Sequence, residues 1–415
     1  MPPLAPHLTP PFTVDDFNDD ENLAILRRCQ RRIVELEAQI AQEKGIKKPA
    51  SYMKSFTNMG RCIAKVVTTF GSLDSLIAEN DRRMALEDKR MRGEDVHDEE
   101  EEPTVDQDRA FNGFKELMRF VPALRKPLFE ADVEELTEIL NALRNGSRNA
   151  RSDDTKNIKV AIIPWLRQLF PDMVALDSDS RDDRGLYNDD IGEILCPIEY
   201  PWDDEEVRTK IREGDPDYLV SADSWFLGLY PHKKFNSEIP DEGLFMNVTL
   251  LKVWKYIFTS PVSVKTTLLE EKENAPRTSG APPNRPKKSS RRATTTPKRS
   301  VAALIGLSRV SGRSIAYAAV QYRVALSDAH HWDENDGAFD YIQFYNNVVD
   351  YFEFPPGPIA KQEVARLLDW WNTNALNHPI TWSLYDGATA PDSSVMRMKA
   401  IRAAREVGLD IIPTN

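Results

Sequence analysis

The stretch Asn247–Phe258, NVTLLKVWKYIF, indicates the class of fold to expect for the whole chain. Its apolar side chains recur every three or four residues, at Val248, Leu251, Trp254, Ile257 and Phe258. That spacing gathers them on one stripe of an α-helix, whereas a half-buried strand would alternate apolar and polar residues. We therefore predict a helix here that packs its apolar stripe against a core.

The same spacing recurs along the chain and predicts further helices near 52–91, 132–143, 158–170, 315–326, 339–352 and 364–371. We expect the second of these to end at Asn145-Gly146, a typical helix stop. Only GEILCPIEY, residues 192–200, is β-prone, and its Pro197 restricts it to an edge strand. The predicted fold class is mostly α: an irregular helical domain with at most a short edge strand or hairpin.

The N-terminal part divides by composition. Residues 1–20 are rich in Pro and Asp and are expected to be disordered. Residues 21–92 are predicted to form a helical segment whose beginning, 23–43, resembles a coiled coil. Its a- and d-like positions are Leu26, Cys29, Ile33, Leu36 and Ile40. With fewer than three clean repeats, two interpretations stay open: self-association through 23–43, or an amphipathic helix that docks on its own domain.

Two charged segments are expected to interrupt the folded part. Residues 94–108 hold nine acids and no Lys or Arg, which predicts an extended acidic linker at 93–108. Residues 266–300 carry Pro, Ser, Thr, Lys and Arg without apolar periodicity, which predicts a disordered basic insertion. Because the helical pattern resumes directly after Ser300, residues 109–410 are interpreted as a single helical domain that contains this insertion.

Overall composition restricts the classes of function. The net charge of -12 argues against a protein whose whole surface binds phosphate groups. The three cysteines are scattered, which is typical of free thiols in an intracellular protein. No window has the apolar length of a membrane span, and the first residues do not resemble a secretory signal. We expect an intracellular protein that does not enter a membrane.

No familiar catalytic or nucleotide-binding motif is present, so no catalytic residue is assigned, and neither a cofactor nor a metal is expected. An enzyme with a site assembled only in space stays the alternative, with candidates Asp203, Asp204, His232, His330 and His331. The acidic clusters are explained by turns and by the start of a helix. The tryptophans and Cys196 are interpreted as core residues.

The basic run from Arg285 to Ser300, RPKKSSRRATTTPKRS, is the clearest functional feature of the sequence. The candidates for contact with an import receptor or with phosphates are Arg285, Lys287, Lys288, Arg291, Arg292, Lys298 and Arg299. Paired charges favour a nuclear import signal, and the absence of interleaved aromatics leaves at most weak, non-specific binding of nucleic acid. A solvated loop is the other interpretation. Thr294 and Thr296 are candidate phosphorylation sites that would lower the local charge.

Several blocks of the chain resemble a known family. They are the segment GEILCPIEYPWDDEEVRTKIREGDPDYLVSADSWFLGLY and, later, LLKVWKYIFTSP, RSIAYAAVQYRVALS and FDYIQFYNNVVDYFEFPPGPIAKQEVARLLDWWN. In this order they are similar to a domain of unknown function from mushroom-forming (basidiomycete) fungi, over roughly residues 110–405. The resemblance implies one conserved domain with the basic segment as an inserted loop. It implies no reaction, cofactor or site residue.

Three hypotheses of function follow. The preferred one is a non-enzymatic, nuclear interaction module whose partner is another protein. The second is an enzyme with a cryptic site. The third is a factor of chromatin or of a mobile element that binds nucleic acid through the basic loop.

Overall fold

The structure is a computed structural model that describes residues 50–93, 102–231, 236–261, 263–264, 299–330 and 332–376. Within these ranges the chain is mostly helical, and the only sheet is an antiparallel hairpin of β1 (Asn335–Asp336) and β2 (Phe339–Asp340). This confirms the predicted fold class, including its allowance of one short hairpin. Predictions for residues 1–49 and for the part of the predicted domain beyond residue 376 lie outside the described residues.

The α-helices are α2 (Ala50–Gly60), α3 (Ile63–Val66), α4 (Leu73–Met91), α5 (Val105–Phe120), α6 (Arg125–Glu130), α7 (Val133–Ala161), α8 (Ile163–Leu169), α9 (Asp189–Leu195), α10 (Glu205–Glu213), α11 (Val248–Phe258), α13 (Val301–Ile305), α14 (Gly312–Leu326), α15 (Tyr341–Glu353) and α16 (Pro358–Leu376). Four short 3-10 helices connect them: η1 (Pro122–Leu124), η2 (Gly185–Tyr187), η3 (Pro216–Tyr218) and η4 (Leu227–Leu229).

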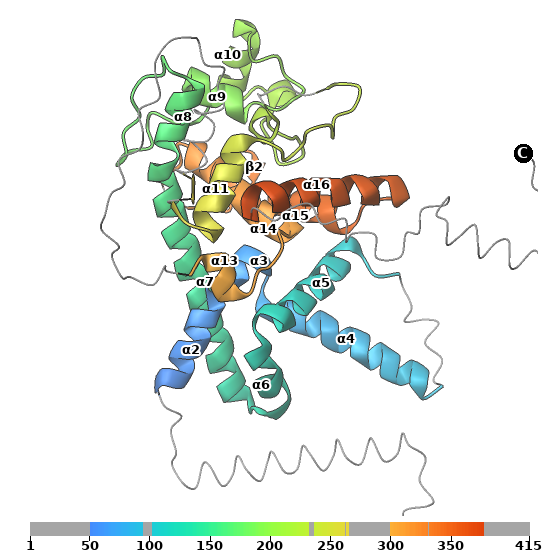
Figure 1. The fold of residues 1–415 in the computed structure, drawn as a ribbon. Helices are drawn as coiled ribbons and strands as arrows, with labels where there is room; N and C mark the ends of the chain where they lie inside the picture. Colours follow the sequence, from blue (N-terminus) through green and yellow to red (C-terminus); the bar gives the residue numbers. More distant parts are fainter. Residues whose placement is uncertain are drawn as a thin grey trace, which may run out of the picture.

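Helix α14 is the centre of the molecule, and every one of its residues is buried. It begins in a capping box in which Ser311 and Ser314 satisfy each other's backbone N–H groups. Helices α3, α7, α9, α11 and α15 pack around it, and α16 covers α11 (Figure 1). The predicted stripe of α11 is confirmed only in part: Val248 is exposed, and buried residues surround most of the helix, because α11 lies between α14 and α16.

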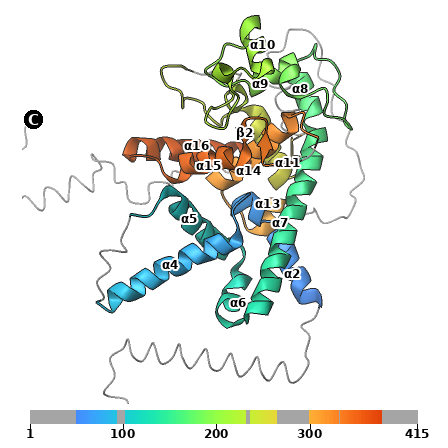
Figure 2. The same cartoon turned by 180° about the vertical axis from the view of Figure 1, so that it is seen from behind.

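Helix α7 runs along most of the length of the molecule in both views (Figures 1 and 2). The prediction that this helix ends at Asn145-Gly146 is wrong, because α7 continues through Gly146 to Ala161. Gly146 is needed for packing instead: a Cβ there would lie 1.9 Å from the carbonyl oxygen of Thr57 in α2. The same crossing brings Gly60 of α2 against the backbone of Leu143. Gly146 therefore permits close contact between helices α7 and α2, and it does not form a turn.

The prediction of an edge strand at residues 192–200 is also wrong, because the first half of this β-prone stretch belongs to helix α9. Asn188 caps this helix by accepting a hydrogen bond from the backbone N–H of Ile191, and Asp189 and Asp190 occupy its first turn. A favourable cap outweighs the β-propensity of a short apolar run. All that remains of the predicted edge strand is a single bridge between Pro197 and Phe226.

The N-terminal helices share the core of the predicted domain. Phe56, Ile63 and Leu76 belong to the same buried apolar cluster as Trp254 and Trp371. The predicted boundary at residue 109 therefore does not separate two cores. The predicted linker is also too long, since α5 begins at Val105 behind a capping box of Thr104 and Gln107. The acids of its first turn favour the helix dipole, which explains why this acidic stretch is helical.

Helix α4 packs mainly against α5, and in both views its far end projects from the body of the molecule (Figures 1 and 2). None of the described helices combines the length and the apolar character that crossing a bilayer requires.

Candidate functional site

A group of buried charges lies at the carboxyl end of α14, where two arginines bind its last carbonyls. Arg181 donates to the carbonyl oxygens of Val324 at 2.5 Å and of Ser327 at 3.4 Å. Arg184, fully buried, donates to the carbonyl of Ala325 at 2.6 Å. These cations meet the negative end of the helix dipole and satisfy carbonyls that have no partner within the helix. Burial lowers the pKa of both guanidiniums, which nevertheless stay charged.

A tight loop positions the two arginines. Gly185 has a φ of +75°, and a Cβ at this position would lie 2.6 Å from the carboxyl carbon of Asp328. The carboxylate of Asp183 accepts a hydrogen bond from the backbone N–H of Asp177, which closes the loop across six residues. Burial, the largest cause, raises the pKa of Asp328 above its usual range, and Asp336 adds to the effect.

Three stacked aromatic rings, those of Phe70, Trp332 and Tyr341, lie beside this end of α14, and we call them the aromatic wall. The ring of Trp332 stacks on Tyr341 at 5.6 Å and on Phe70 at 6.0 Å between ring centres. The guanidinium of Arg151 lies over Trp332 at 5.1 Å. Because this pair is partly removed from water, it adds a cation–π attraction to the packing of the rings. These ring contacts join the loop between α3 and α4, helix α7 and the residues on either side of the hairpin.

The hairpin is held by a third buried arginine. Arg323 of α14 places its guanidinium 3.9 Å from the ring centre of Phe339 in β2. It also lies 3.9 Å from the carboxylate of Asp336 in β1. The hairpin is therefore attached to α14 by a cation that contacts both of its strands.

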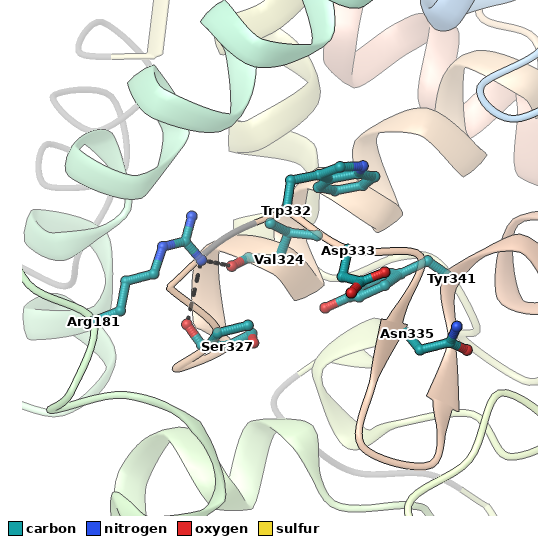
Figure 3. Close-up of a pocket in the computed structure, with 8 residues that line it drawn as sticks. Arg181, Val324, Ser327, Trp332, Asp333, Asn335 and Tyr341 are labelled. Carbon is teal, nitrogen blue, oxygen red and sulfur yellow. Dashed lines mark hydrogen bonds between the residues drawn. The ribbon is translucent and has the colours of Figure 1, made fainter.

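A cavity of about 10 Å³ lies between Arg181 and the aromatic wall (Figure 3). It is lined by Arg181, Val324, Ser327, Ala329, Trp332, Asp333, Asn335 and Tyr341. This volume is at the lower limit of what one water molecule needs. The arrangement can seat a water among polar groups and fix the end of α14, and it has no room for a substrate.

A second feature is the acidic segment, which we define as residues 171–217. It holds sixteen acids and five bases, a net charge of -11 in a chain whose total is -12. Part of it folds around a small apolar cluster of Cys196, Trp202, Val207 and Ile211, whereas Met173, Leu176, Ile191, Ile194 and Leu195 belong to the main core. Helix α10 begins at the cap of Asp204 and ends at Gly214 in the left-handed conformation, as its charge pattern predicts.

All five bases of the acidic segment are engaged in contacts within the protein, three of them inside the segment and two with α14. Arg181 and Arg184 bind the end of α14, as described above. Arg208 donates to the carbonyl of Trp202, and Arg212 donates to that of Leu186 and pairs with Asp189. Lys210 pairs with Glu206 at 2.8 Å. Most of the carboxylates of the segment are exposed, so its surface is strongly negative.

Of the residues of the alternative enzyme hypothesis, the three that the structure describes, Asp203, Asp204 and His330, do not line the cavity. Asp204 caps α10 by accepting from the backbone N–H of Glu206, and Asp203 beside it is exposed. His330 pairs with Asp182 at 2.9 Å on the surface. His232 and His331 lie outside the described residues. In the part of the chain that the structure describes, no group of three His, Cys, Asp or Glu side chains is arranged to hold a metal ion.

The explanations given for several other residues are confirmed in part. Cys196, Trp202, Trp254 and Trp371 are buried, as core residues should be, whereas Trp225 and Trp370 are partly buried and pack against the core. Burial raises the pKa of Cys196 to about 12, so the thiol is a poor nucleophile. Asp189–Asp190, attributed to turn chemistry, instead open helix α9.

Of the basic run, the structure describes only Arg299 and Ser300. Arg299 is exposed, and Ser300 caps α13 by accepting from the backbone N–H of Ala303. The other candidates, Arg285, Lys287, Lys288, Arg291, Arg292 and Lys298, and both threonines, Thr294 and Thr296, lie outside the described residues.

Sequence reasoning missed the buried arginines 181, 184 and 323 and the half-buried Arg151. One local feature pointed to two of them: RDDRG at 181–185 places two bases within a run of acids and directly before a glycine. Nothing local identified Arg151 or Arg323, whose aromatic partners Trp332 and Phe339 come from other parts of the chain.

Comparison with known proteins gives one match. Residues 145–376 match the model of a family described as "Family of unknown function (DUF6698)". The matched range contains both the cavity and the acidic segment. No curated protein and no solved structure matches the chain significantly.

Proposed function

Because the chain belongs to the DUF6698 family, whose description assigns no activity, we propose from the described surface that it is a non-enzymatic interaction module that binds a basic segment of a partner protein. The observation that carries this proposal is the surface of the acidic segment. Three of its five bases are engaged within the segment, and Arg181 and Arg184 are engaged at the end of α14, so its exposed carboxylates have few cations left to neutralise them.

Apolar side chains on the same segment support a protein partner. Val174 and Tyr187 are 80% and 71% exposed, although large apolar groups are usually buried. A tyrosine within a negative surface can stack on a lysine or arginine while carboxylates pair with the charge. Nucleic acid, which is itself negative, would be repelled by this surface.

A titration with a defined probe tests the proposal. The probe is a fluorescein-labelled peptide of alternating Lys, Leu and Arg residues, compared with its Glu-containing counterpart and with duplex DNA. We expect the acidic segment to bind only the basic peptide, with an affinity that falls as salt rises. Asp203→Asn, Glu205→Gln and Glu213→Gln together should weaken binding about tenfold, since each exposed charge contributes up to roughly 1 kcal/mol.

A matched variant distinguishes this surface from net charge alone. Asp81→Asn, Glu87→Gln and Glu102→Gln remove three exposed acids from α4 and from the residues before α5. This variant should bind the basic peptide as the wild type does. Equal losses in the two variants, or no binding of the basic peptide at all, would refute the proposal.

We further propose that the module works in the nucleus, addressed by the basic run at 285–299, and that its family is one of mushroom-forming fungi. The paired charges of the run support the first part. A fluorescent fusion in which the six bases of residues 287–299 are changed to Ala should leave the nucleus. Retention of that variant in nuclei would place the address elsewhere.

The nucleic-acid alternative makes a different prediction for the same run. If the protein is an interaction module, the seven positive charges of the run, together with Arg277 before it, give at most weak duplex binding that is insensitive to sequence, with a log–log salt slope of about -7, and that is lost at physiological salt. Strong preference for one duplex at physiological salt would favour that alternative over an interaction module.

A further inference from the structure

The turn between α6 and α7 exposes two large apolar side chains. Phe129 is 85% and Val133 is 83% exposed, the two highest values among the large apolar residues that the structure describes. They are four residues apart, and the half-buried Leu128 and Leu136 lie beside them in sequence. We call Phe129 and Val133 the apolar turn. Phe129, near the end of α6, and Val133, at the start of α7, lie on the two sides of this turn, and exposed apolar patches favour contact with another segment.

Charged residues around the apolar turn indicate what kind of segment fits. Residues 132–138 contain four acids, Asp132, Glu134, Glu135 and Glu138. In the N-terminal segment, residues 27–32 contain four arginines, Arg27, Arg28, Arg31 and Arg32. The arginines accompany an apolar stripe of Leu26, Cys29, Ile33, Leu36 and Ile40 at helical spacing. The apolar stripe of the N-terminal segment therefore complements the apolar turn, and the arginines of the segment complement the acids at the start of α7.

The chain between the two segments is short. The hydroxyl of Tyr52, in the first turn of α2, lies 3.4 Å from the carboxylate of Glu135 in the first turn of α7. The start of α2 and the α6–α7 turn lie at the same end of the molecule in both views (Figures 1 and 2). Nine residues separate Ile40 from Ala50. An extended chain of that length spans roughly 30 Å, enough to bring the stripe back onto the turn.

We propose that residues 26–40 form an amphipathic helix that docks on Phe129 and Val133 of the same chain. Docking places the apolar stripe against the two exposed side chains and the arginines beside the acids of α7. Of the two interpretations of the N-terminal segment, the proposal favours docking on the same chain, or docking in cis, over self-association. A tethered segment has a high effective concentration at its own surface, so docking in cis needs little intrinsic affinity.

Native cysteines make the proposal directly testable in the full chain. Cys29 lies on the apolar stripe, whereas Cys62 and Cys196 are buried and their pKa values are raised to about 12 by burial. In Val133→Cys or Phe129→Cys, mild oxidation should join the new thiol to Cys29 and give a cross-linked monomer, seen as a faster band on a non-reducing gel. The cross-link should disappear when Ile33→Glu and Leu36→Glu are added.

A matched control places the cysteine at an equally exposed apolar position elsewhere. Val174→Cys, with Val174 80% exposed, should give no cross-link to Cys29. Because the substituted side chains are exposed, each reduced variant should melt as the wild type does. A cross-linked dimer would show that a second copy covers the turn and would overturn docking in cis. Absence of any cross-link in both Val133→Cys and Phe129→Cys would overturn the proposal altogether.

Discussion

Gly146 of α7 lies so close to Thr57 of α2 that a Cβ on the glycine would be 1.9 Å from the carbonyl oxygen of the threonine. Gly60 of α2 has the same relation to Leu143 at 2.2 Å. Backbone meets backbone at both points, so no flexible side chain can move aside. This crossing attaches a helix that precedes the matched family range to the longest helix of the fold.

Substitution of Gly146 by Ala should therefore destabilise the protein by about 1–3 kcal/mol or more, the usual cost of overpacking. At an exposed helix position the same change would stabilise the protein by up to roughly 1 kcal/mol. The sign of the change in the free energy of unfolding therefore shows whether Gly146 is in close contact with α2. Urea unfolding followed by circular dichroism measures it. Gly357→Ala is the matched control, because nothing lies within 4 Å of a Cβ there. A neutral or stabilising Gly146→Ala would contradict the close crossing.

Removal of the Arg313 side chain should cost about 3–5 kcal/mol, because it leaves a buried ion pair without its cation. Arg313 is 3% exposed and donates to both carboxylate oxygens of Glu353, at 2.6 and 2.8 Å. It also donates to the carbonyls of Val67 and Arg109, so it joins α14 and α15 to the N-terminal helices.

Thermal and urea unfolding of Arg313→Ala measure this cost. Arg119→Ala is the control, since Arg119 is half exposed and pairs with Glu116 at 3.3 Å. Such surface pairs contribute at most about 1 kcal/mol. Similar losses in the two variants would count against a structural role specific to Arg313.

Glu79 should make stability depend on pH in the acid range. Hydrogen bonds from Arg82, and then from Arg83, hold the pKa of this buried carboxyl below its usual 4.5. A lowered folded-state pKa gives stability that is fully present above about pH 4.5 and is lost as pH falls through the folded-state value. The free-energy difference between wild type and Glu79→Gln should be about 1–3 kcal/mol at pH 7 and should shrink towards pH 3.

The exposed Glu87, which pairs with Arg90 at 3.5 Å, provides the control for that measurement. Glu87→Gln should follow the wild type at every pH. A difference between wild type and Glu79→Gln that stays constant from pH 7 to pH 3 would show that Glu79 is not held ionised.

Replacement of residues 270–297 by a short Gly/Ser linker should leave one cooperative unfolding transition. The chain leaves the core at Val264 and returns to it at Ala302, and both belong to the same apolar cluster. The length of a surface loop changes stability little, roughly 0.6 kcal/mol per doubling. Calorimetry of the shortened protein measures the transition. Two separate transitions, or loss of cooperative melting, would mean that the replaced residues take part in the core.

Local patterns in the sequence predicted several of the helices, although the helix expected near 52–91 is divided into α2, α3 and α4. The spacing of apolar residues predicts α11, α14, α15 and α16, and acids before VRTKIREG predict the start of α10. These features depend on residues a few positions apart, so the sequence alone contains the information.

Contacts between distant residues decided the rest. Gly146 looks like a helix stop in sequence, and only the backbone of α2 across from it shows that the glycine serves a helix crossing. Arg181 and Arg184 look like surface charges until the carboxyl end of α14 supplies their acceptors. The same glycine or arginine fits either role, because burial and partners depend on what the fold brings opposite it. The amino-acid sequence by itself thus determined the helical class of this protein, whereas the tertiary structure decided where its helices cross and which charges are buried.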